Sequence, residues 1–342
     1  MNVLVVGGGS IGQRHIANLL KLNNTEQIFV LTKNRNCLNG FDCKNKDRVK
    51  LIDSLTNASD DPSALLPPGS SDAKFDFAII ANETHNHIET AINLARQGIN
   101  LFIEKPLSHN LEKIDELKEI IREKKLKAFV GYNLRFLGAL QYIKEQLTKK
   151  VIGKLFFSKI EVGHYLPAWK PDEDYRENYR TKKEKGGGVA LDLSHEIDYM
   201  RFLFGDPAKW KIIKTKTSEL EMDTDDLFEG IFEYKEGFIC NVHMDFLQQI
   251  KKRKIKIIGS NGVINCDFID ECIKIVVIDP ATGGKKKEIK TDDKHLFNVP
   301  GTYLEEVNHF IKTIDKNVEP DITLNDGVKA LMLLEDGFVQ GQ

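Results

Sequence analysis

The stretch Asn2-Val3-Leu4-Val5-Val6-Gly7-Gly8-Gly9-Ser10-Ile11-Gly12, at the start of the chain, decides the fold. Its first five residues are typical of a strand buried on both faces, and a helical spacing of apolar residues follows over Gln13–Leu22. Gly7, Gly9 and Gly12 match the pattern G-x-G-x-x-G. Placed between a strand and a helix, this pattern indicates dinucleotide binding, because the glycines permit a tight turn, a close pyrophosphate and close helix packing. The alternative is a tight turn without a ligand.

The helix that begins after these glycines favours the same ligand. Its first N–H groups and its dipole suit phosphates, so Ser10 and Ile11 join the glycines as cofactor-binding candidates. The second predicted strand, Ile28–Leu31, is followed by Thr32, Lys33 and Arg35 rather than by an acid. An acid there would bind a ribose 2′-hydroxyl, whereas cations suit a 2′-phosphate, so NADP is preferred over NAD. The alternative is that Lys33 and Arg35 are solvated loop residues.

Strands and helices continue to alternate up to residue 130. The predicted strands are Phe75–Ala81, Asn100–Ile103 and Lys127–Val130, and the predicted helices are Glu89–Gln97 and Leu111–Lys125. This rhythm is typical of a parallel sheet with right-handed crossovers. Residues 1–130 are therefore expected to form a Rossmann-type α/β domain.

Residues 131–342 have a different pattern, with longer strands that alternate and follow one another closely. They predict a second domain of the α+β class with a large, mostly antiparallel sheet. The strands are expected at Lys154–Gly163, Lys211–Thr217, Phe228–Tyr234, Phe238–Phe246, Lys254–Ile258, Val263–Phe268 and Ile273–Ile278, and the helices at Leu140–Leu147, Ala190–Phe204, Tyr303–Ile314 and Asn325–Val339. Lys285-Lys286-Lys287 is interpreted as a solvated hairpin tip.

Composition excludes several classes of protein. The 342 residues carry 49 basic and 51 acidic side chains, and a net charge of −2 argues against a dedicated nucleic-acid binder. No apolar run is long enough to span a membrane, and the N-terminus lacks a signal peptide pattern. The five cysteines show no paired spacing, which fits reduced thiols. We therefore expect a cytoplasmic protein that binds neither nucleic acid nor membrane.

Polar residues follow two of the predicted strands of the first domain. Glu104 and Lys105 come directly after Asn100–Ile103, at the edge where open parallel sheets bind ligands. A lysine in that position can serve as a proton donor or electrostatic partner, and an exposed cap is the alternative. After Phe75–Ala81 come further candidates for the nicotinamide side, although a helix cap explains a histidine equally well. These candidates are Ala81, Asn82, Thr84 and His87.

A third group of polar residues lies after Gly186-Gly187-Gly188. Asp192 and His195 are three residues apart, so on one helix they would share a face. A carboxylate beside a histidine can fix its tautomer and raise its basicity.

Taken together, four motifs resemble the Gfo/Idh/MocA oxidoreductases. They are Gly7-x-Gly9-x-x-Gly12-x-x-His15, Glu104-Lys105-Pro106, Gly131-Tyr132-Asn133-x-Arg135-Phe136 and Gly186-Gly187-Gly188-x3-Asp192-x2-His195-x2-Asp198. The resemblance covers essentially the whole chain. It implies reversible oxidation of a secondary alcohol on a sugar, sugar derivative or cyclitol with NADP or NAD. It also implies a homodimer or homotetramer formed through the open sheet, and no metal is expected.

The resemblance also implies roles for particular residues. Lys105 would touch nicotinamide and substrate, His195 would accept the hydroxyl proton, and Asp192 would orient the substrate or His195. Asn133 and Arg135 would bind substrate. The Asp-to-His spacing is one residue shorter than is common in the family, so Glu196 is an alternative to Asp192.

The region upstream of the glycines is similar to a subgroup linked to bacterial surface-sugar biosynthesis. His164, Tyr165, Trp169 and Arg176 are candidates there for stacking on a sugar and hydrogen bonding to it. The alternative is an oligomer arm. Two other functions remain open for the whole chain: a non-catalytic dinucleotide-binding sensor, and a dehydrogenase of a non-sugar ring.

Overall fold

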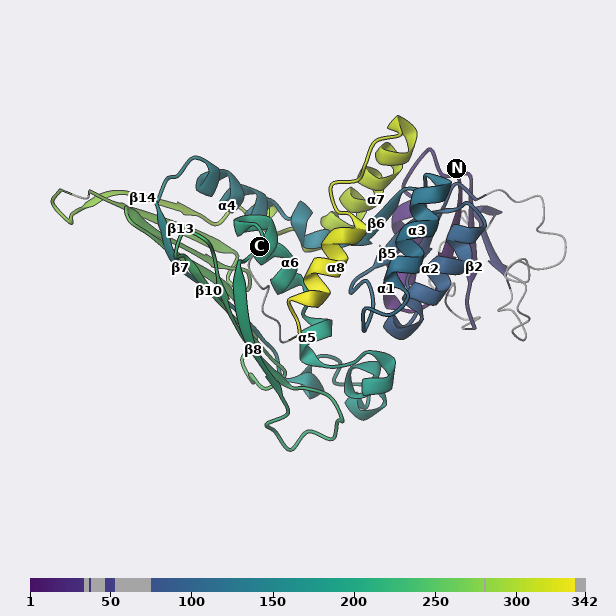
Figure 1. Ribbon diagram of the computed structural model, residues 1–342, viewed down its shortest axis with the longest axis horizontal. Helices are drawn as coiled ribbons and strands as arrows, with labels where there is room; N and C mark the ends of the chain where they lie inside the picture. The colour runs from purple at the N-terminus through teal and green to yellow at the C-terminus, as the bar shows by residue number, and fades with distance from the viewer. Residues whose placement is uncertain (34–36, 38–46, 53–74, 280, 336–342) are drawn as a thin grey trace. The chain divides into compact units, whose positions relative to one another are not determined.

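The computed structural model describes residues 1–33, 37, 47–52, 75–279 and 281–335 (Figure 1). They pack as two compact units. The first comprises Met1–Asn133 with Pro300–Val328, and the second comprises Leu134–Val299 with the chain from Lys329. The sequence pattern predicts a single division at residue 131, whereas the first unit also includes a later segment of the chain. That segment contributes a helix to the first unit.

The first unit contains a six-stranded parallel sheet, as the sequence predicts. Its strands lie in the order β3 (Val49–Ile52), β2 (Gln27–Leu31), β1 (Asn2–Val6), β4 (Phe77–Ile80), β5 (Asn100–Glu104) and β6 (Ala128–Gly131). Each neighbouring pair is parallel. Because β1 lies between β2 and β4, the strand order reverses there, and such a switch point is where open sheets bind ligands. The short edge strand β3 was not predicted.

Helices of the first unit pack on this sheet (Figure 1). They are α1 (Ser10–Leu19), α2 (His87–Arg96), α3 (Ile114–Lys124) and most of α7 (Val299–Lys316). In α7, Phe310 packs edge-on against Phe77 and Phe102, with ring centroids 5.5 and 5.9 Å apart. The apolar face of α7 therefore belongs to the core of the first unit, although the sequence pattern assigns this helix to the second domain.

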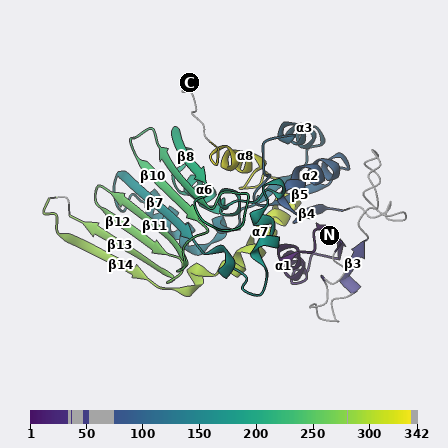
Figure 2. The same ribbon diagram turned by 90° about the horizontal axis from the view of Figure 1, so that it is seen from below.

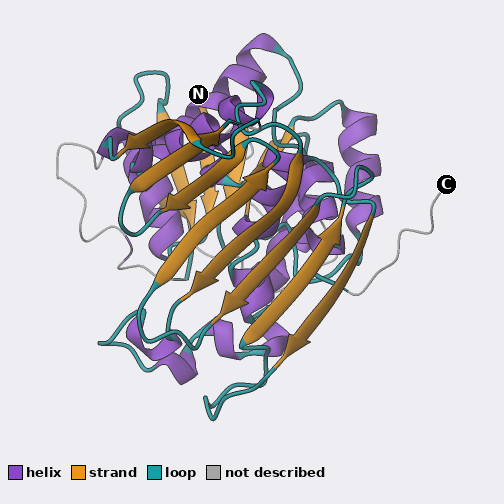
Figure 3. Ribbon diagram, turned by 90° about the vertical axis from the view of Figure 1, so that its left-hand side faces the viewer, coloured by secondary structure: helices purple, strands orange, loops and turns teal. Residues whose placement is uncertain are grey.

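The second unit contains an eight-stranded sheet, which Figures 2 and 3 show as one broad layer. Its order is β14 (Lys285–Thr291), β13 (Cys272–Ile278), β12 (Gly262–Asp267), β11 (Lys252–Gly259), β7 (Leu155–Gly163), β10 (Ile239–Asp245), β9 (Leu227–Glu233) and β8 (Lys209–Thr215). Every neighbouring pair is antiparallel except β7 with β10. The predicted mostly antiparallel sheet is therefore confirmed. The predicted hairpin tip is wrong, because Lys285 begins strand β14.

One face of this sheet is covered and the other carries exposed apolar side chains. On β7, Ser158, Ile160 and Val162 are buried, and α6 (His195–Phe204) packs against this strand and α4 (Gly138–Thr148). Strand register places Ile213, Ile231 and Ile239 together on the other face, with 59%, 54% and 41% of their surface exposed. Three isoleucines in that state mark a candidate contact surface.

The predicted helix Ala190–Phe204 is wrong as a single element. It is divided into α5 (Val189–Asp192) and α6, with Leu193 and Ser194 between them. The remaining α-helix is α8 (Leu324–Met332). The 3₁₀ helices whose bounds lie within the described residues include η4 (Thr84–Asn86), η5 (Asn133–Phe136), η6 (Leu166–Ala168), η7 (Tyr175–Glu177), η8 (Tyr179–Thr181), η9 (Lys183–Lys185) and η10 (Lys294–Phe297).

Two expectations from composition concern membranes and thiols. Within the described ranges, no helix has both the length and the hydropathy required to cross a bilayer. Cys37, Cys240, Cys266 and Cys272 are free thiols.

Candidate functional site

The turn between β1 and α1 requires glycine at two positions. Gly7 has φ +109°, and a Cβ added there would lie 2.4 Å from the carbonyl oxygen of Ala81. A Cβ on Gly12 would lie 2.0 Å from the carbonyl oxygen of Gly7. Both distances are far below van der Waals contact, so only glycine allows this strand and helix to approach so closely.

Gly9 is different, and it provides the test of whether a dinucleotide fits. A Cβ added at Gly9 would meet no atom within 4 Å, so the space beside its backbone is open. Gly9 is also the N-cap of α1, where no side chain caps the helix. The backbone at Ser10 and Ile11 therefore begins a ten-residue helix beside an open space, which suits a pyrophosphate. The residues fit the predicted cofactor.

The structure describes part of the segment that would select NADP or NAD. Thr32 lies beside the glycine turn, since a Cβ on Gly8 would be 2.6 Å from its Oγ1. Lys33 is exposed. Arg35 lies outside the described residues, so the choice between the two cofactors stays a prediction.

The loop after β4 is joined to the loop after β5 through His87. This side chain is buried, with Nδ1 2.9 Å from the carbonyl oxygen of Pro106 and Nε2 3.1 Å from that of Asn82. Burial lowers the pKa of His87, while the two carbonyl groups oppose that shift. In the same loop, Asn82 Nδ2 donates to Thr90 Oγ1 at 3.0 Å, and Thr84 is buried. His87 thus holds two loops together, and its predicted cofactor contact stays a prediction.

Lys105 follows Glu104, the last residue of β5, and its backbone N–H is hydrogen-bonded to the Glu104 side chain. Glu104 is buried, and its Oε1 lies 2.5 Å from His15 Nε2. Its Oε2 accepts a hydrogen bond of 3.1 Å from the backbone N–H of Lys105. The Lys105–Pro106 peptide bond is cis. Because Lys105 is half-buried and α3 begins only at Ile114, it is not an exposed helix cap.

The structure gives contacts to the two predicted substrate residues of the third motif. Asn133 is buried, and its Nδ2 donates to Thr302 Oγ1 at 2.7 Å. Arg135 makes a bidentate ion pair with Asp198, with N–O distances of 2.6–3.1 Å. Both side chains thus have partners within their own units, and their roles with substrate stay predictions.

In the second unit, Asp192 has partners that the sequence did not predict. Asp192 is buried at the end of α5, where it accepts hydrogen bonds from Tyr179 Oη at 2.7 Å and Arg180 Nε at 2.9 Å. His195 is half-buried and begins α6, so the prediction that the two residues share one helix face is wrong. The alternative acid, Glu196, is buried in an ion pair with Arg253, at 2.8 and 3.0 Å.

Arg180 also connects Asp192 to the predicted sugar-binding residues. Its guanidinium carbon lies 5.0 Å from the centre of the Trp169 ring, and Trp169 stacks on His164 with centroids 5.5 Å apart. Trp169 Nε1 donates to the His164 carbonyl oxygen at 2.9 Å. Tyr165 is half-buried, and its backbone N–H donates to the Gln248 carbonyl oxygen at 2.8 Å. His164, Trp169, Arg180 and Asp192 thus form one continuous set, which we call the Trp169 cluster.

Tyr179 and Arg180 are the residues that sequence reasoning missed. They lie between the predicted sugar-binding residues and the glycine run, in the segment Asn178-Tyr179-Arg180. The sequence feature that could have indicated a role for this segment is the adjacent aromatic and cationic residue. Which carboxylate they bind depends on contacts between separate segments.

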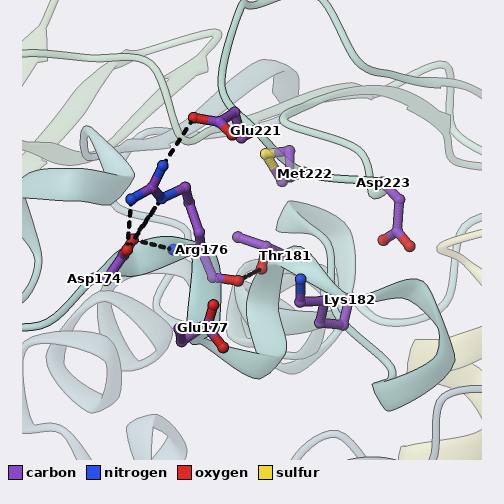
Figure 4. Close-up of a pocket in the computed structure, with 8 residues that line it drawn as sticks. All are labelled: Asp174, Arg176, Glu177, Thr181, Lys182, Glu221, Met222 and Asp223. Carbon is purple, nitrogen blue, oxygen red and sulfur yellow. Dashed lines mark hydrogen bonds and ion pairs between the residues drawn. The ribbon is translucent and has the colours of Figure 1, made fainter.

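Arg176 is placed in a shallow surface pocket of about 530 Å³ (Figure 4). It donates to Asp174 at 2.7–3.1 Å and to Glu221 at 3.2 Å, and the hydrogen bonds from Arg176 lower the pKa of Asp174 to about 2. The described residues that line this pocket include no aromatic side chain: Asp174, Arg176, Glu177, Thr181, Lys182, Glu221, Met222 and Asp223. The pocket therefore offers no ring for sugar stacking.

Comparison with known proteins identifies the family from both parts of the chain. The model for the oxidoreductase family with an NAD-binding Rossmann fold matches residues 1–132, and the model for the GFO/IDH/MocA C-terminal domain matches residues 140–265. The chain belongs to the GFO/IDH/MocA oxidoreductase family. The predicted resemblance is therefore confirmed at the level of the family.

Three members of this family illustrate how the chain compares with known proteins. Myo-inositol 2-dehydrogenase of Thermotoga maritima is 25% identical over 343 residues, which cover 97% of this chain and 94% of that protein. A levoglucosan dehydrogenase solved in complex with NADH has a TM-score of 0.78 at 18% identity, covering 98% and 95% of the two chains. The WlbA dehydrogenase of Bordetella pertussis, solved with NADH and UDP-GlcNAcA, has a TM-score of 0.77 at 18% identity, covering 98% and 93%. The two structures establish a shared fold.

Proposed function

We propose that the chain is an NAD(P)-dependent dehydrogenase that oxidises a secondary alcohol on a sugar, a sugar derivative or a cyclitol. The observation that carries the proposal is the open backbone at Gly9 at the start of α1, at the strand switch point of the first unit. Lys105 emerges from the carboxyl end of β5, which lies beside β4 in the same parallel sheet. A dinucleotide-binding turn and a lysine at the same sheet edge suit hydride transfer in this oxidoreductase family.

The proposed chemistry divides among three residues. The nicotinamide of bound NAD(P) supplies the hydride acceptor. Lys105 donates a hydrogen bond to the substrate hydroxyl oxygen and holds that oxygen in place as charge develops on it. His195 accepts the hydroxyl proton, a role suited to an imidazole near neutral pH. Asp192, held by Tyr179 and Arg180, orients the substrate hydroxyl or His195.

The Trp169 cluster is the proposed sugar-recognition surface. Trp169 is half-buried and already contacts His164 and Arg180, so we propose that the exposed part of its indole ring contacts the C–H groups of a sugar ring. His164 and Tyr165 offer polar atoms beside it. Asn133, Arg135 and Arg176 have less support as substrate contacts, because each is already bonded to a protein side chain.

A turnover screen tests the proposed function. It should combine NAD and NADP with myo-inositol, other cyclitols, free sugars, levoglucosan and UDP-linked sugars that include a uronic acid. The inositol-dehydrogenase relative favours a cyclitol, while similarity to the surface-sugar subgroup and the WlbA structure favour a nucleotide-linked sugar. Reduction of the cofactor with one of these substrates supports the proposal. Tight dinucleotide binding without turnover on any of them would favour the non-catalytic sensor, and turnover confined to a non-sugar ring would favour the third alternative.

The cofactor preference is proposed separately. No acid follows β2, and Lys33 is exposed there, so we propose that NADP is preferred over NAD. Replacement Arg35→Ala is expected to raise the Kd for NADP more than the Kd for NAD, by roughly tenfold, because only NADP carries the 2′-phosphate. Equal losses for the two cofactors would remove the reason for this preference.

We also propose that the chain forms a homodimer or homotetramer through the open face of the eight-stranded sheet. Ile213, Ile231 and Ile239 support this interface. Replacement Ile231→Asp is expected to shift the mass measured by light scattering toward the monomer, because the contact would bury a charge. An unchanged mass for an assembled protein would place the interface elsewhere.

A further inference from the structure

A buried group of three titratable side chains lies beneath Lys105 in the first unit. It consists of His15 from α1, Glu104 from β5 and Glu306 from α7, and one nitrogen or oxygen atom of each lies within 4.8 Å of the others. His15 and Glu306 are fully buried, and Glu104 is 6% exposed. The packing of α7 explains how Glu306 reaches this place. Glu306 is one helical turn before Phe310, which packs on the sheet beside Phe102 of β5.

The hydrogen bonds in this group are distributed unevenly. Glu104 Oε1 pairs with His15 Nε2, and its Oε2 accepts the backbone N–H of Lys105. Neither oxygen of Glu306 has a hydrogen-bond partner, and neither does His15 Nδ1. Burying a charged carboxylate that accepts no hydrogen bond costs far more free energy than burying the same group as a neutral carboxylic acid.

Two carboxyl groups this close in a dry environment do not both ionise. Glu104 receives the hydrogen bonds that favour a charge, and Glu306 receives none, so the retained proton belongs on Glu306. Burial raises the pKa of Glu306 well above its ordinary range, and the charge of Glu104 adds to this shift. Among the described residues, the titratable groups next to these three include Tyr303 of α7 and Arg14 of α1, whose guanidinium carbon lies 4.5 Å from the Tyr303 ring centre. Burial raises the pKa of Tyr303 to about 12, so its ring carries no charge at neutral pH.

The same three residues could in principle hold a cation, and one distance argues against it. A first-row metal ion with bonds of about 2.0–2.2 Å keeps neighbouring ligand atoms at least about 3 Å apart. His15 Nε2 and Glu104 Oε1 are 2.5 Å apart, which is the separation of a short hydrogen bond. A proton therefore fits the group better than a metal ion.

We propose that Glu306 is a neutral carboxylic acid, and that by adding no second charge beside Glu104 it acts as a positioning residue for Lys105. With Glu306 neutral, no like charge repels the Glu104 carboxylate, which keeps the orientation in which it pairs with His15 and accepts the Lys105 N–H. Ionisation of Glu306 would place a second negative charge beside Glu104. The repulsion would turn Glu104 away from His15 and from the backbone of Lys105. The positioning role rests on the proposed function, in which Lys105 contacts substrate, whereas the neutral state of Glu306 does not.

The first test measures protonation without any substrate. Glu306→Gln keeps the shape of the side chain and cannot ionise, and Glu305→Gln removes an exposed carboxylate from the neighbouring position as a matched control. A group whose pKa is raised in the folded state loses its stabilising effect as pH rises above the pKa of the unfolded chain. The Tm of the unsubstituted protein is therefore expected to fall relative to that of Glu306→Gln by roughly 5 °C between pH 5 and pH 8. The Glu305→Gln difference is expected to stay flat.

Infrared spectroscopy and metal analysis complete this test. The unsubstituted protein at pH 7 is expected to show a carboxylic-acid C=O band that Glu306→Gln lacks and Glu305→Gln retains. A flat Tm difference together with an unchanged band would overturn the proposal. One equivalent of bound metal in the purified protein, lost in Glu306→Gln, would also overturn it in favour of a cation site.

The second test measures positioning with a substrate from the turnover screen. Glu306→Gln keeps a neutral polar side chain of the same shape beside Glu104 and is expected to retain most of kcat. Glu306→Leu removes the polar group beside Glu104, and its kcat is expected to fall roughly tenfold with little change in the Kd for the dinucleotide. If Glu306→Leu does not fold, Glu306→Ala takes its place. Equal kcat values for the glutamine and apolar variants would overturn the positioning role while leaving the proposed function intact.

Discussion

Two parts of the protein depend on different kinds of contact. The glycine turn of the first unit depends on backbone atoms, whereas Asp192 in the second unit depends on side-chain partners. In the turn, Gly7 and Gly12 are required by backbone atoms only a few residues away or on the adjoining strand. Asp192 is held by side chains of Tyr179 and Arg180, which come from another segment. A site built from backbone leaves a readable motif, whereas a site built from side-chain partners does not.

The largest expected effect is at Lys105 in the first unit. Its replacement tests whether this unit contributes to catalysis. Lys105→Ala is expected to lower turnover by roughly 10³-fold, because it removes the ammonium group that we propose contacts the substrate oxygen. The Kd for the dinucleotide, measured by fluorescence, is expected to stay within a few-fold. Lys118→Ala, on the exposed face of α3, serves as the control. Unchanged turnover in Lys105→Ala would refute the assignment of this residue.

The next prediction compares two glycines of the same turn, one expected to be needed for stability and the other for dinucleotide binding. Gly12→Ala is expected to lower the free energy of unfolding by roughly 2–3 kcal/mol, because its Cβ would overlap the Gly7 carbonyl oxygen. Gly9→Ala has open space and an extended backbone, so stability is expected to change little, while dinucleotide affinity falls roughly tenfold or more. Thermal unfolding and fluorescence titration measure the two effects. A Gly9→Ala variant that binds normally would show that no pyrophosphate approaches this backbone.

A smaller effect is expected where side chains hold the site. Arg180→Gln removes the cation that pairs with buried Asp192, so kcat is expected to fall roughly tenfold and the unfolding free energy by about 2 kcal/mol. Tyr179→Phe removes one hydrogen bond and is expected to cost about 1 kcal/mol. Arg176→Gln, at an exposed ion pair, is the control and should change neither quantity by a measurable amount. If kcat fell equally in Arg176→Gln and Arg180→Gln, the result would contradict the proposal that the Trp169 cluster in particular binds the sugar.

The smallest effect concerns a second side-chain network, on the eight-stranded sheet. His243 lies between Asp245 on its own strand and Glu229 on β9, at 2.8 and 2.5 Å. Its hydrogen bond with Asp245 raises the pKa of His243, burial opposes the shift, and Glu229 reinforces it. The stabilisation is therefore present below the pKa of an unfolded histidine and is lost as pH rises through the raised value.

The corresponding measurement is the Tm of His243→Gln relative to the unsubstituted protein. The difference is expected to be about 2 °C at pH 5.5 and to shrink by pH 8.5. His295→Gln, at an exposed histidine, is expected to show no such trend. A difference that grows with pH would contradict the assigned sign.

The elements that sequence did not reveal have identifiable physical reasons. Strand β14 begins with Lys285-Lys286-Lys287, and its first four residues are exposed. The charged residues remove the apolar alternation by which a strand is predicted. They also disfavour pairing of this edge strand with another chain. Strand β3 is a four-residue edge strand with two exposed positions, which leaves little apolar signal. Helix α5 is held at its start by Asp225, which accepts the Ala190 N–H at 2.9 Å, and at its end by the contacts of Asp192. These tertiary contacts interrupt a helix that the apolar spacing alone would continue.

The amino-acid sequence by itself determined the parallel sheet, the glycine turn and the family, because these depend on local backbone conformation and on the period of apolar residues. Only the tertiary structure decided that α7 packs with the first unit and brings Glu306 to Glu104, and that Arg180 rather than a nearer residue pairs with Asp192. The partner of a buried charge is selected by the energy of desolvation across segments that are distant in the chain, and no short motif records that choice.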